Sequence, residues 1–125
     1  MSIRVFLLDD HEIVRRGLRE LLESTDDIDV VGESGSALEA ERRIPSLRPD
    51  VAIFDARLQD GSGIDACRHV RSVDPTIKGL ILTSYDDEQA LTSAVLAGAS
   101  AFVPKHLAAQ TLGHTVVRAF ADIRS

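Results

Sequence analysis

The chain has 125 residues, of which 44% are hydrophobic and 27% charged, a composition typical of one globular domain with a core of its own. Acidic residues outnumber basic ones by 20 to 14, and the formal charge of -6 argues against this segment itself gripping a nucleic-acid backbone. The single cysteine, Cys67, excludes an internal disulfide, and the sequence contains neither a signal-peptide pattern nor a bilayer-spanning apolar run. We therefore expect one cytoplasmic domain over residues 1–125, without membrane contact.

Apolar runs typical of buried strands alternate along the chain with segments of helical periodicity. The expected strands cover residues 3–8, 28–31, 51–55, 80–82 and 101–103. The expected helices cover residues 11–22, 36–47, 64–73, 86–97 and 112–123. Pro45 should kink or end the second helix early, and Pro75 should end the third. This alternation predicts an α/β domain with a parallel sheet and right-handed crossovers.

Each expected helix carries apolar side chains at helical spacing, which we assign to the face that packs on the sheet. The assigned residues are Ile13, Val14, Leu18, Leu21, Leu22, Ala37, Leu38, Ala40, Ile44, Leu47, Ile64, Cys67, Val70, Val73, Ala90, Leu91, Ala94, Val95, Leu112, Val116, Phe120 and Ile123. Gly17 interrupts the first helix and weakens it, unless a neighbouring element packs closely there.

The strand expected at residues 51–55 is apolar on both faces and stops at a carboxylate, Asp55. Such a strand belongs in the centre of a parallel sheet with helices on either side. Its end opens into the crevice where open α/β sheets bind ligands. Asp55 could serve there as a nucleophile, as a metal ligand or only as a cap for the next helix, and on Asp55 alone the cap is favoured.

Four further polar residues stand at or just beyond the ends of expected strands: Asp9, Asp10, Thr83 and Lys105. If the strand order is flavodoxin-like, the first and third strands are neighbours, and the three carboxylates gather in one crevice. Carboxylates that close repel one another, and a hard divalent cation such as Mg²⁺ offsets the repulsion. A carboxylate beside such a cation can accept a phosphoryl group, with a lysine and a hydroxyl to neutralise charge and position it.

Each of these residues also has a purely structural interpretation. Asp9 with Glu12 matches a capping box, Thr83 could be a structural hydrogen-bonding residue, and Lys105 could be a solvated turn residue. The four histidines show no paired metal-ligand spacing and are interpreted as surface or cap residues: His11, His69, His106 and His114. Cys67 lies on an apolar helix face and is interpreted as a reduced core residue. A functional site is favoured because these polar residues stand together at the ends of successive strands.

Four phrases carry a resemblance that covers essentially the whole chain. They are Leu8-Asp9-Asp10-His11-Glu12, Asp60-Gly61-Ser62-Gly63-Ile64, Ile81-Leu82-Thr83-Ser84 and Ala97-Gly98-Ala99. The chain resembles the receiver domain of bacterial two-component response regulators, in the subfamily with a LuxR-type helix-turn-helix output domain. The resemblance implies a flavodoxin-like, doubly wound five-stranded parallel sheet of order 2-1-3-4-5 with helices on both faces.

The resemblance also implies a role for each matching residue. Asp55 would be the phosphoacceptor. Asp9 and Asp10 would hold Mg²⁺ together with Asp55 and the main-chain carbonyl of Arg57.

Three residues of the last two strands would complete the phosphorylation site and its switch. Thr83 would reach the phosphoryl oxygens, Lys105 would pair with the phosphate, and Phe102 occupies the position of the switch aromatic. Gln59 stands where the family commonly has a proline, which is expected to loosen the loop after Asp55. His106 follows Lys105 where a proline often stands, so no cis-proline peptide bond is expected there.

The implied partners are a sensor histidine kinase and a second copy of the chain on phosphorylation, with DNA bound only through an output domain absent from these residues. The chain would act as a signalling phosphoacceptor and not as an enzyme. Three alternatives stay open: a flavin- or nucleotide-binding module, a phosphatase of the haloacid dehalogenase kind, and a degenerate receiver that works only as an interaction module. Asp9-Asp10 argues against the first, and the position of Asp55 on the third strand argues against the second.

Overall fold

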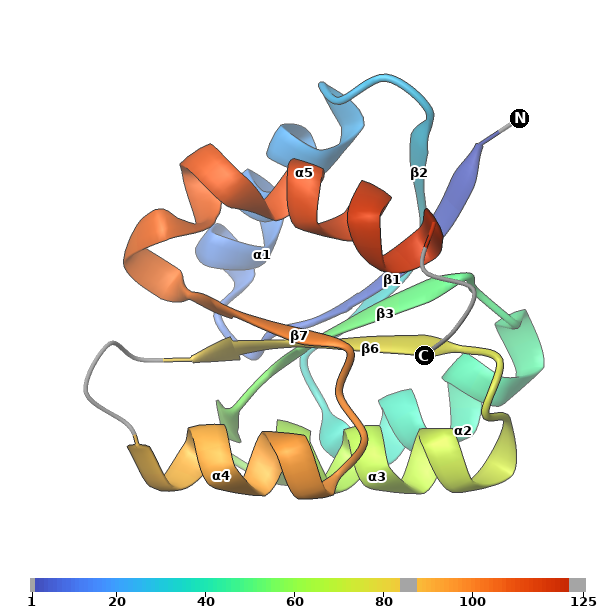
Figure 1. Ribbon diagram of the computed structural model, residues 1–125, viewed down its shortest axis with the longest axis vertical. Helices are drawn as coiled ribbons and strands as arrows, with labels where there is room; N and C mark the ends of the chain where they lie inside the picture. Colours follow the sequence, from blue (N-terminus) through green and yellow to red (C-terminus); the bar gives the residue numbers. More distant parts are fainter. Residues whose placement is uncertain (1, 84–87, 122–125) are drawn as a thin grey trace.

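The computed structural model describes residues 2–83 and 88–121, with side chains omitted for 88–91 (Figure 1). Its strands are β1 (Ile3–Leu8), β2 (Ile28–Ser34), β3 (Val51–Asp55), β4 (Arg57–Leu58), β5 (Gly61–Ser62), β6 (Lys78–Thr83) and β7 (Ala101–Pro104). Its helices are α1 (Glu12–Glu23), α2 (Ala37–Leu47), α3 (Gly63–Val73), α4 (Glu88–Leu96) and α5 (Ala108–Ala121), with a 3₁₀ turn η1 (Lys105–Leu107).

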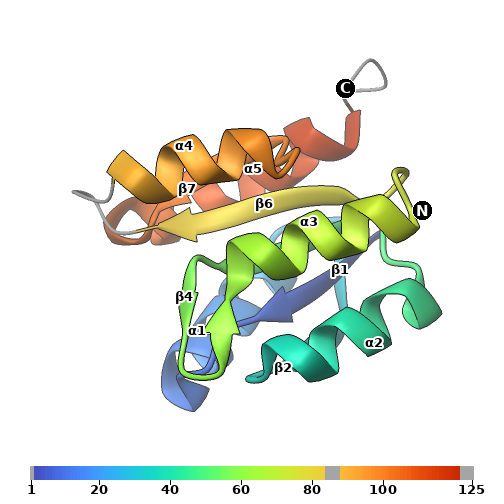
Figure 2. The ribbon, with the colours of Figure 1, turned by 90° about the horizontal axis from the view of Figure 1, so that it is seen from below.

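Five strands form one parallel sheet in the order β2-β1-β3-β6-β7. Counted along the sheet strands alone, this is the expected 2-1-3-4-5 order of a flavodoxin-like fold. The remaining two strands, β4 and β5, pair antiparallel in a small hairpin directly after β3. Figure 2 shows this hairpin at the same end of the molecule as the arrowheads of β1 and β6. The hairpin was not among the expected elements, because two-residue strands leave no periodic pattern.

Helices cover both faces of the sheet. Figure 1 shows α1 and α5 on one face, and α2, α3 and α4 on the other. Successive side chains of a strand point to opposite faces, so β3 contributes Phe54 to the core under α2 and α3 and Ile53 to the core under α1 and α5. Both cores are fully shielded at this strand, and all five residues of β3 are buried as its two-sided apolar pattern predicts.

Two element boundaries differ from the expected ones. β2 continues from residue 31 to Ser34, and its pairing with β1 is shifted by one residue between Val5 and Phe6. Pro45 lies inside α2 and does not end it early. The proline sits in the last turn, where one helical hydrogen bond is lost, and the helix ends two residues later with Arg48 in a left-handed conformation.

Several apolar side chains assigned to buried helix faces are exposed instead. The expectation is wrong for Ile13, Val14, Leu38, Val73, Val95 and Phe120. On α1 the buried side chain is Leu22, and Ile13 in the first turn is 83% exposed. A helix lies on the sheet along a narrower stripe than its apolar residues span, so the outermost residues face solvent. Among the described residues, no neighbouring atom lies within 4 Å of the position a Cβ would take at Gly17, so none of them packs closely there.

The C-terminal helix begins at Ala108, earlier than expected, while Ile123 lies outside the described residues. The first residues of the helix expected at 86–97 also lie outside them. Within residues 2–83 and 88–121, no helix combines the length and the hydrophobicity that crossing a bilayer requires. Cys67 is fully buried, as expected, and its burial raises the pKa of the thiol to about 11.

Candidate functional site

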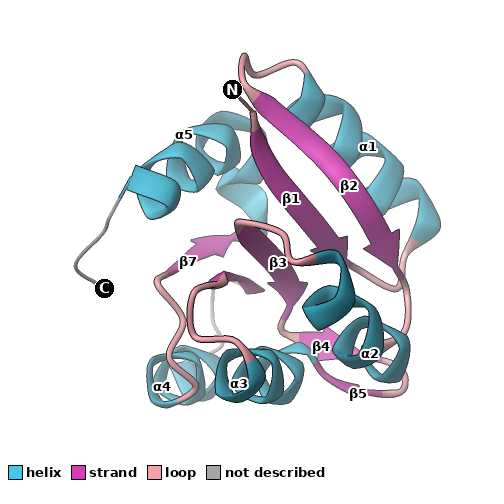
Figure 3. Cartoon of the chain, turned by 90° about the vertical axis from the view of Figure 1, so that its right-hand side faces the viewer, coloured by secondary structure: helices cyan, strands magenta, loops and turns pink. Residues whose placement is uncertain are grey.

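The site residues predicted from the sequence lie at the carboxyl end of the parallel sheet. Figure 3 shows the arrowheads of β1, β2 and β3 pointing toward the same end of the molecule. Asp9 and Asp10 follow the last residue of β1, Asp55 ends β3 and Thr83 ends β6. Lys105 follows β7 directly. The structure therefore gathers the five residues at one edge, as the parallel order requires.

Asp9 is fully buried and belongs to the turn between β1 and α1. Its Oδ1 accepts a hydrogen bond of 2.9 Å from the main-chain N–H of His11, which is the N-cap residue of α1. Its main-chain carbonyl accepts a hydrogen bond from the guanidinium of Arg15, which also pairs with Glu33 of β2 at 2.9 Å. The capping-box interpretation of Asp9 with Glu12 is wrong, because α1 begins at Glu12 itself.

Asp10 joins the acidic pair to the β4–β5 hairpin. Its Oδ2 accepts a hydrogen bond of 2.7 Å from the main-chain N–H of Gln59. A proline at this position would have no N–H to donate. Gln59 therefore ties the loop after Asp55 to Asp10, and this hydrogen bond opposes the loosening that the sequence predicts.

Asp55 is 1% exposed and pairs with Lys105, whose Nζ donates to its Oδ2 at 2.9 Å. Its Oδ1 receives a longer contact of 3.4 Å from the main-chain N–H of Arg57. Burial raises the pKa of Asp55 above its ordinary value, and the charge of Asp9 adds to the rise, while Lys105 opposes it. The buried carboxylate is thus poorly compensated by the protein alone. Lys105 is a partner of the site and not a free turn residue.

Close packing fixes the main chain at Asp55. A Cβ built on Gly63, the first residue of α3, would lie 1.7 Å from the carbonyl oxygen of Asp55. The N–H of Gly63 donates to the carbonyl of Ala56 at 3.1 Å, and the N–H of Ala56 donates to Leu82 of β6 at 2.9 Å. Glycine at position 63 therefore lets α3 begin against the end of β3. This close contact explains why the Asp60-to-Ile64 motif has a glycine there.

The acidic cluster has the donor set of a cation site. Asp9 Oδ2 and Asp10 Oδ1 are buried, and neither accepts a hydrogen bond within the described part of the chain. One ligand atom each from Asp9, Asp10, His11 and Asp55 can lie within 4.8 Å of one another. Buried polar atoms without partners are rare in native proteins and call for an ion or another partner. Carboxylate oxygens are the ligands that Mg²⁺ prefers, so the residues present fit that ion.

The two predicted switch residues lie in the other half of the edge. Thr83 is 2% exposed and follows Leu82, the residue paired with Asp55 in the sheet. Phe102 of β7 is 41% exposed and pairs in register with Ile81. Ser84 and Tyr85, which continue the loop after Thr83, lie outside the described residues. The structure thus places Thr83 beside the phosphoacceptor candidate and Phe102 at the surface.

The family model of the response regulator receiver domain matches residues 5–117, which is most of the chain. The chain belongs to this family. Membership identifies it as a regulatory receiver domain rather than a conventional enzyme, and it argues against the flavin-binding and dehalogenase-like alternatives.

Comparison with curated relatives indicates the subfamily to which the receiver domain belongs. The receiver domain is 51% identical over 114 residues to the DNA-binding transcriptional activator DevR/DosR of Mycobacterium tuberculosis, a match over 91% of this chain and 52% of that protein. It is 34% identical over 116 residues to the response regulator VraR of Staphylococcus aureus, covering 93% of this chain and 56% of that protein. The chain spans about half the length of these curated relatives.

A solved structure supports the same subfamily. A LuxR-family response regulator from Aurantimonas superposes with a TM-score of 0.90 at 35% identity, covering 97% of this chain and 86% of that one. The receiver domain is therefore of the LuxR-type subfamily, and its flavodoxin-like fold is shared with its structural neighbours.

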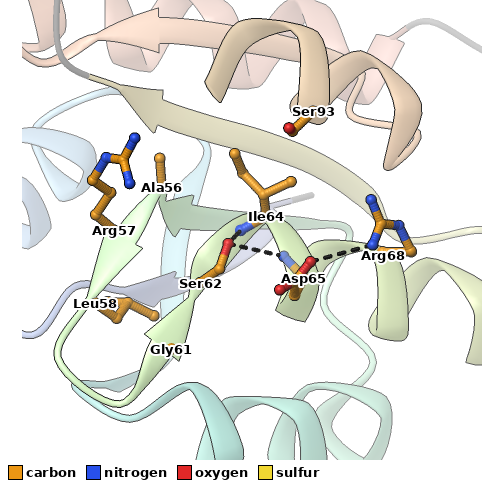
Figure 4. A pocket seen from close by; sticks show the side chains of 9 residues that line it. All are labelled: Ala56, Arg57, Leu58, Gly61, Ser62, Ile64, Asp65, Arg68 and Ser93. Atoms are coloured by element: carbon orange, nitrogen blue, oxygen red, sulfur yellow. Dashed lines mark hydrogen bonds and ion pairs between the residues drawn. The ribbon is translucent and has the colours of Figure 1, made fainter. Parts of the chain in front are cut away.

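A cavity of the receiver domain is lined by residues outside the acidic cluster. This cavity of about 460 Å³ lies between the β4–β5 hairpin, the start of α3 and Ser93 of α4 (Figure 4). Figure 4 shows the guanidinium groups of Arg57 and Arg68 on its two sides, with Arg68 paired to Asp65 at 3.2 Å. Ser62 closes the start of α3 by accepting hydrogen bonds from two main-chain N–H groups. None of the predicted carboxylates lines this cavity.

Sequence reasoning missed one residue of the receiver's acidic cluster. His11 was interpreted as a surface or cap residue, and it is indeed the N-cap of α1 and mostly exposed. However, its Nδ1 lies 3.0 Å from Asp10 Oδ1 and 3.5 Å from Asp9 Oδ1. The search for paired histidine spacing could not find it, because His11 joins carboxylates and not another histidine.

Proposed function

We propose that this receiver domain accepts a phosphoryl group from a sensor histidine kinase onto Asp55, with Mg²⁺ held by Asp9, Asp10, Asp55 and the main-chain carbonyl of Arg57. The observation that carries the proposal is the buried Asp55 carboxylate, which has Lys105 Nζ at 2.9 Å. Nearby, Asp9 Oδ2 and Asp10 Oδ1 are buried and accept no hydrogen bond from the described residues. A nucleophile, a fixed cation and a cation-binding pair are the parts that phosphoryl transfer needs.

The chemistry follows from these charges. A carboxylate oxygen of Asp55 attacks the phosphorus, and a new P–O bond forms. The bond from phosphorus to the donor group breaks, and the donor keeps the electron pair. Bound Mg²⁺ supplies charge neutralisation for the phosphoryl oxygens. Lys105, already paired with Asp55, is positioned to exchange the carboxylate for a phosphoryl oxygen as its partner.

The proposed output is a conformational switch. A phosphoryl group on Asp55 adds acceptor oxygens close to the end of β6, where Thr83 carries a hydroxyl. Movement of Thr83 toward the phosphate would change the packing beside α4 and let Phe102 turn inward from its exposed position. Such a switch needs only differential contacts in two packings. The new surface would promote homodimerisation and act on DNA through an output domain, which the greater length of the relatives supports.

The proposal is tested by covalent labelling. The wild-type domain, incubated with Mg²⁺ and acetyl phosphate, should gain one phosphoryl group by intact-mass spectrometry, and Asp55→Asn should gain none. Lys105→Ala should retain the group poorly, because the phosphate loses its fixed cation. Asp29→Asn is the matched control, since Asp29 is an exposed carboxylate of β2, and it should label like wild type. Equal labelling of Asp55→Asn would overturn the assignment.

The same preparation tests the switch and the alternative function. With beryllofluoride and Mg²⁺, NMR signals of Thr83, Phe102 and α4 should shift together in wild type. Thr83→Ala should bind the analogue but lose the distant shifts, and unchanged distant shifts would show that coupling bypasses Thr83. A wild-type domain that takes neither label would instead support a degenerate receiver acting as an interaction module.

A further inference from the structure

His11 places a nitrogen atom in a cluster that is otherwise made of carboxylates. One of its ring nitrogens and one carboxylate oxygen each of Asp9, Asp10 and Asp55 all lie within 4.8 Å of one another. Its Nδ1 lies 3.0 Å from Asp10 Oδ1 and 3.5 Å from Asp9 Oδ1. The fully buried Asp9 also keeps one oxygen, Oδ2, without a hydrogen-bond partner in the described residues. The cluster is therefore a candidate site with four donors from the protein side chains, one of them an imidazole.

The backbone holds His11 in this position without using its side chain. The N–H of His11 donates to Asp9 Oδ1 at 2.9 Å, and its extended backbone makes it the N-cap of α1. The side chain makes no capping hydrogen bond to the helix. The imidazole is 65% exposed and lies 3.0 Å from Asp10 Oδ1, at the mouth of the acidic cluster. Its ring is thus placed beside the carboxylates and is not required for helix formation.

We propose that His11 Nδ1 is a ligand of this cation site for the later first-row transition ions, so that the site favours ions such as Ni²⁺ and Zn²⁺ over Mg²⁺ more strongly than carboxylates alone would. This proposal rests on the cation site of the proposed function and concerns its selectivity. Imidazole suits the later transition ions, whereas Mg²⁺ takes oxygen ligands and keeps several waters. Mg²⁺ therefore gains nothing from His11, and a transition ion gains a bond.

The consequence is competition at the phosphoacceptor. A transition ion that uses His11 occupies the carboxylates that Mg²⁺ needs, so a low concentration of it displaces Mg²⁺ from the receiver. Which cation occupies the site then depends on the ions present and on His11, the residue next to the acidic pair.

Calorimetric titration of the untagged, metal-stripped chain with Mg²⁺ and with Ni²⁺ tests the proposal. His11→Ala should lower the affinity for Ni²⁺ by about 10-fold or more, and the affinity for Mg²⁺ by less than about 2-fold. His69→Ala is the matched control, because His69 is an exposed histidine of α3 outside the cluster, and it should change neither affinity. Asp10→Asn should weaken the binding of both ions, which shows that they share one site.

A second measurement identifies the ligand atom. In a chain labelled with ¹⁵N-histidine, addition of Zn²⁺ should shift the Nδ1 resonance of His11 before those of the other three histidines. Equal losses of Mg²⁺ and Ni²⁺ affinity in His11→Ala, no loss of either, or a Zn²⁺ shift confined to other histidines would each overturn the proposal. Failure of phosphoryl labelling at Asp55 with His11-dependent Ni²⁺ binding intact would overturn the proposed function only.

Discussion

The two halves of the site differ in how firmly the fold holds them. The acidic half lies at the ends of the neighbouring strands β1 and β3, where Asp9 and Asp55 are almost completely buried. The other half lies at the ends of β6 and β7, and β7 is an edge strand with Val103 as its one buried residue. Phe102 and the side chain of Lys105 are each 41% exposed.

This difference in burial indicates which half of the site can change its packing. A residue held between two strands and two layers of helices has one packing, because displacing it opens the core. A residue on an edge strand has neighbours on one side only and can change its packing at low cost. The fold therefore holds Asp9 and the proposed phosphoacceptor Asp55 firmly, and it leaves Phe102, the proposed switch aromatic, near the surface.

The largest expected difference is in the loss of unfolding free energy when a phenylalanine of each half is replaced by alanine. Phe54 of β3 is fully buried beside Asp55, so Phe54→Ala should cost about 3–5 kcal/mol of unfolding free energy. Phe102→Ala should cost about 1 kcal/mol or less, because its side chain already contacts solvent. Urea unfolding followed by circular dichroism measures both. Equal costs would show that β7 is as firmly packed as β3.

A smaller effect is expected from two helical glycines. Gly63→Ala places a Cβ against the Asp55 carbonyl and should cost about 1–3 kcal/mol, with weaker Mg²⁺ binding because β3 and α3 must separate. Gly17→Ala is the control, because its Cβ would meet no atom within 4 Å. It should stabilise α1 by about 0.5–1 kcal/mol. A tolerated alanine at position 63 would show that the end of β3 is less rigid than its packing indicates.

The smallest effect is electrostatic and concerns the acidic half alone. Without metal, Asp55→Asn should raise the unfolding free energy at pH 7 by about 0.5–2 kcal/mol, because it removes a buried carboxylate beside Asp9. The pKa of Asp55 is raised in the folded state, so its ionised form destabilises the fold once the pH rises through the window above 3.8. The advantage of Asp55→Asn should therefore shrink as the pH falls toward 3.8. Urea unfolding of both proteins from pH 4 to pH 7 measures it, and a constant difference would contradict the burial cost.

The sequence alone determined the alternation of strands and helices and the set of polar residues at the strand ends. Apolar runs and helical patterns are local, so β3 and its terminal Asp55 could be predicted from five residues. The strand order came from the family resemblance. With that order, a parallel sheet places Asp9, Asp10, Asp55, Thr83 and Lys105 at one edge without further information.

Only the tertiary structure decided which apolar residues are covered and which polar groups meet. Ile13 and Leu38 fit the apolar stripes of their helices, but both side chains are mostly exposed in the described structure. The apolar pattern of one helix does not show how much of its surface another element covers. Gln59 holds Asp10 through its main chain, Gly63 admits the Asp55 carbonyl, and His11 approaches the acidic pair through a turn. These contacts depend on backbone atoms and on distances between separate segments, which residue types and spacing do not encode.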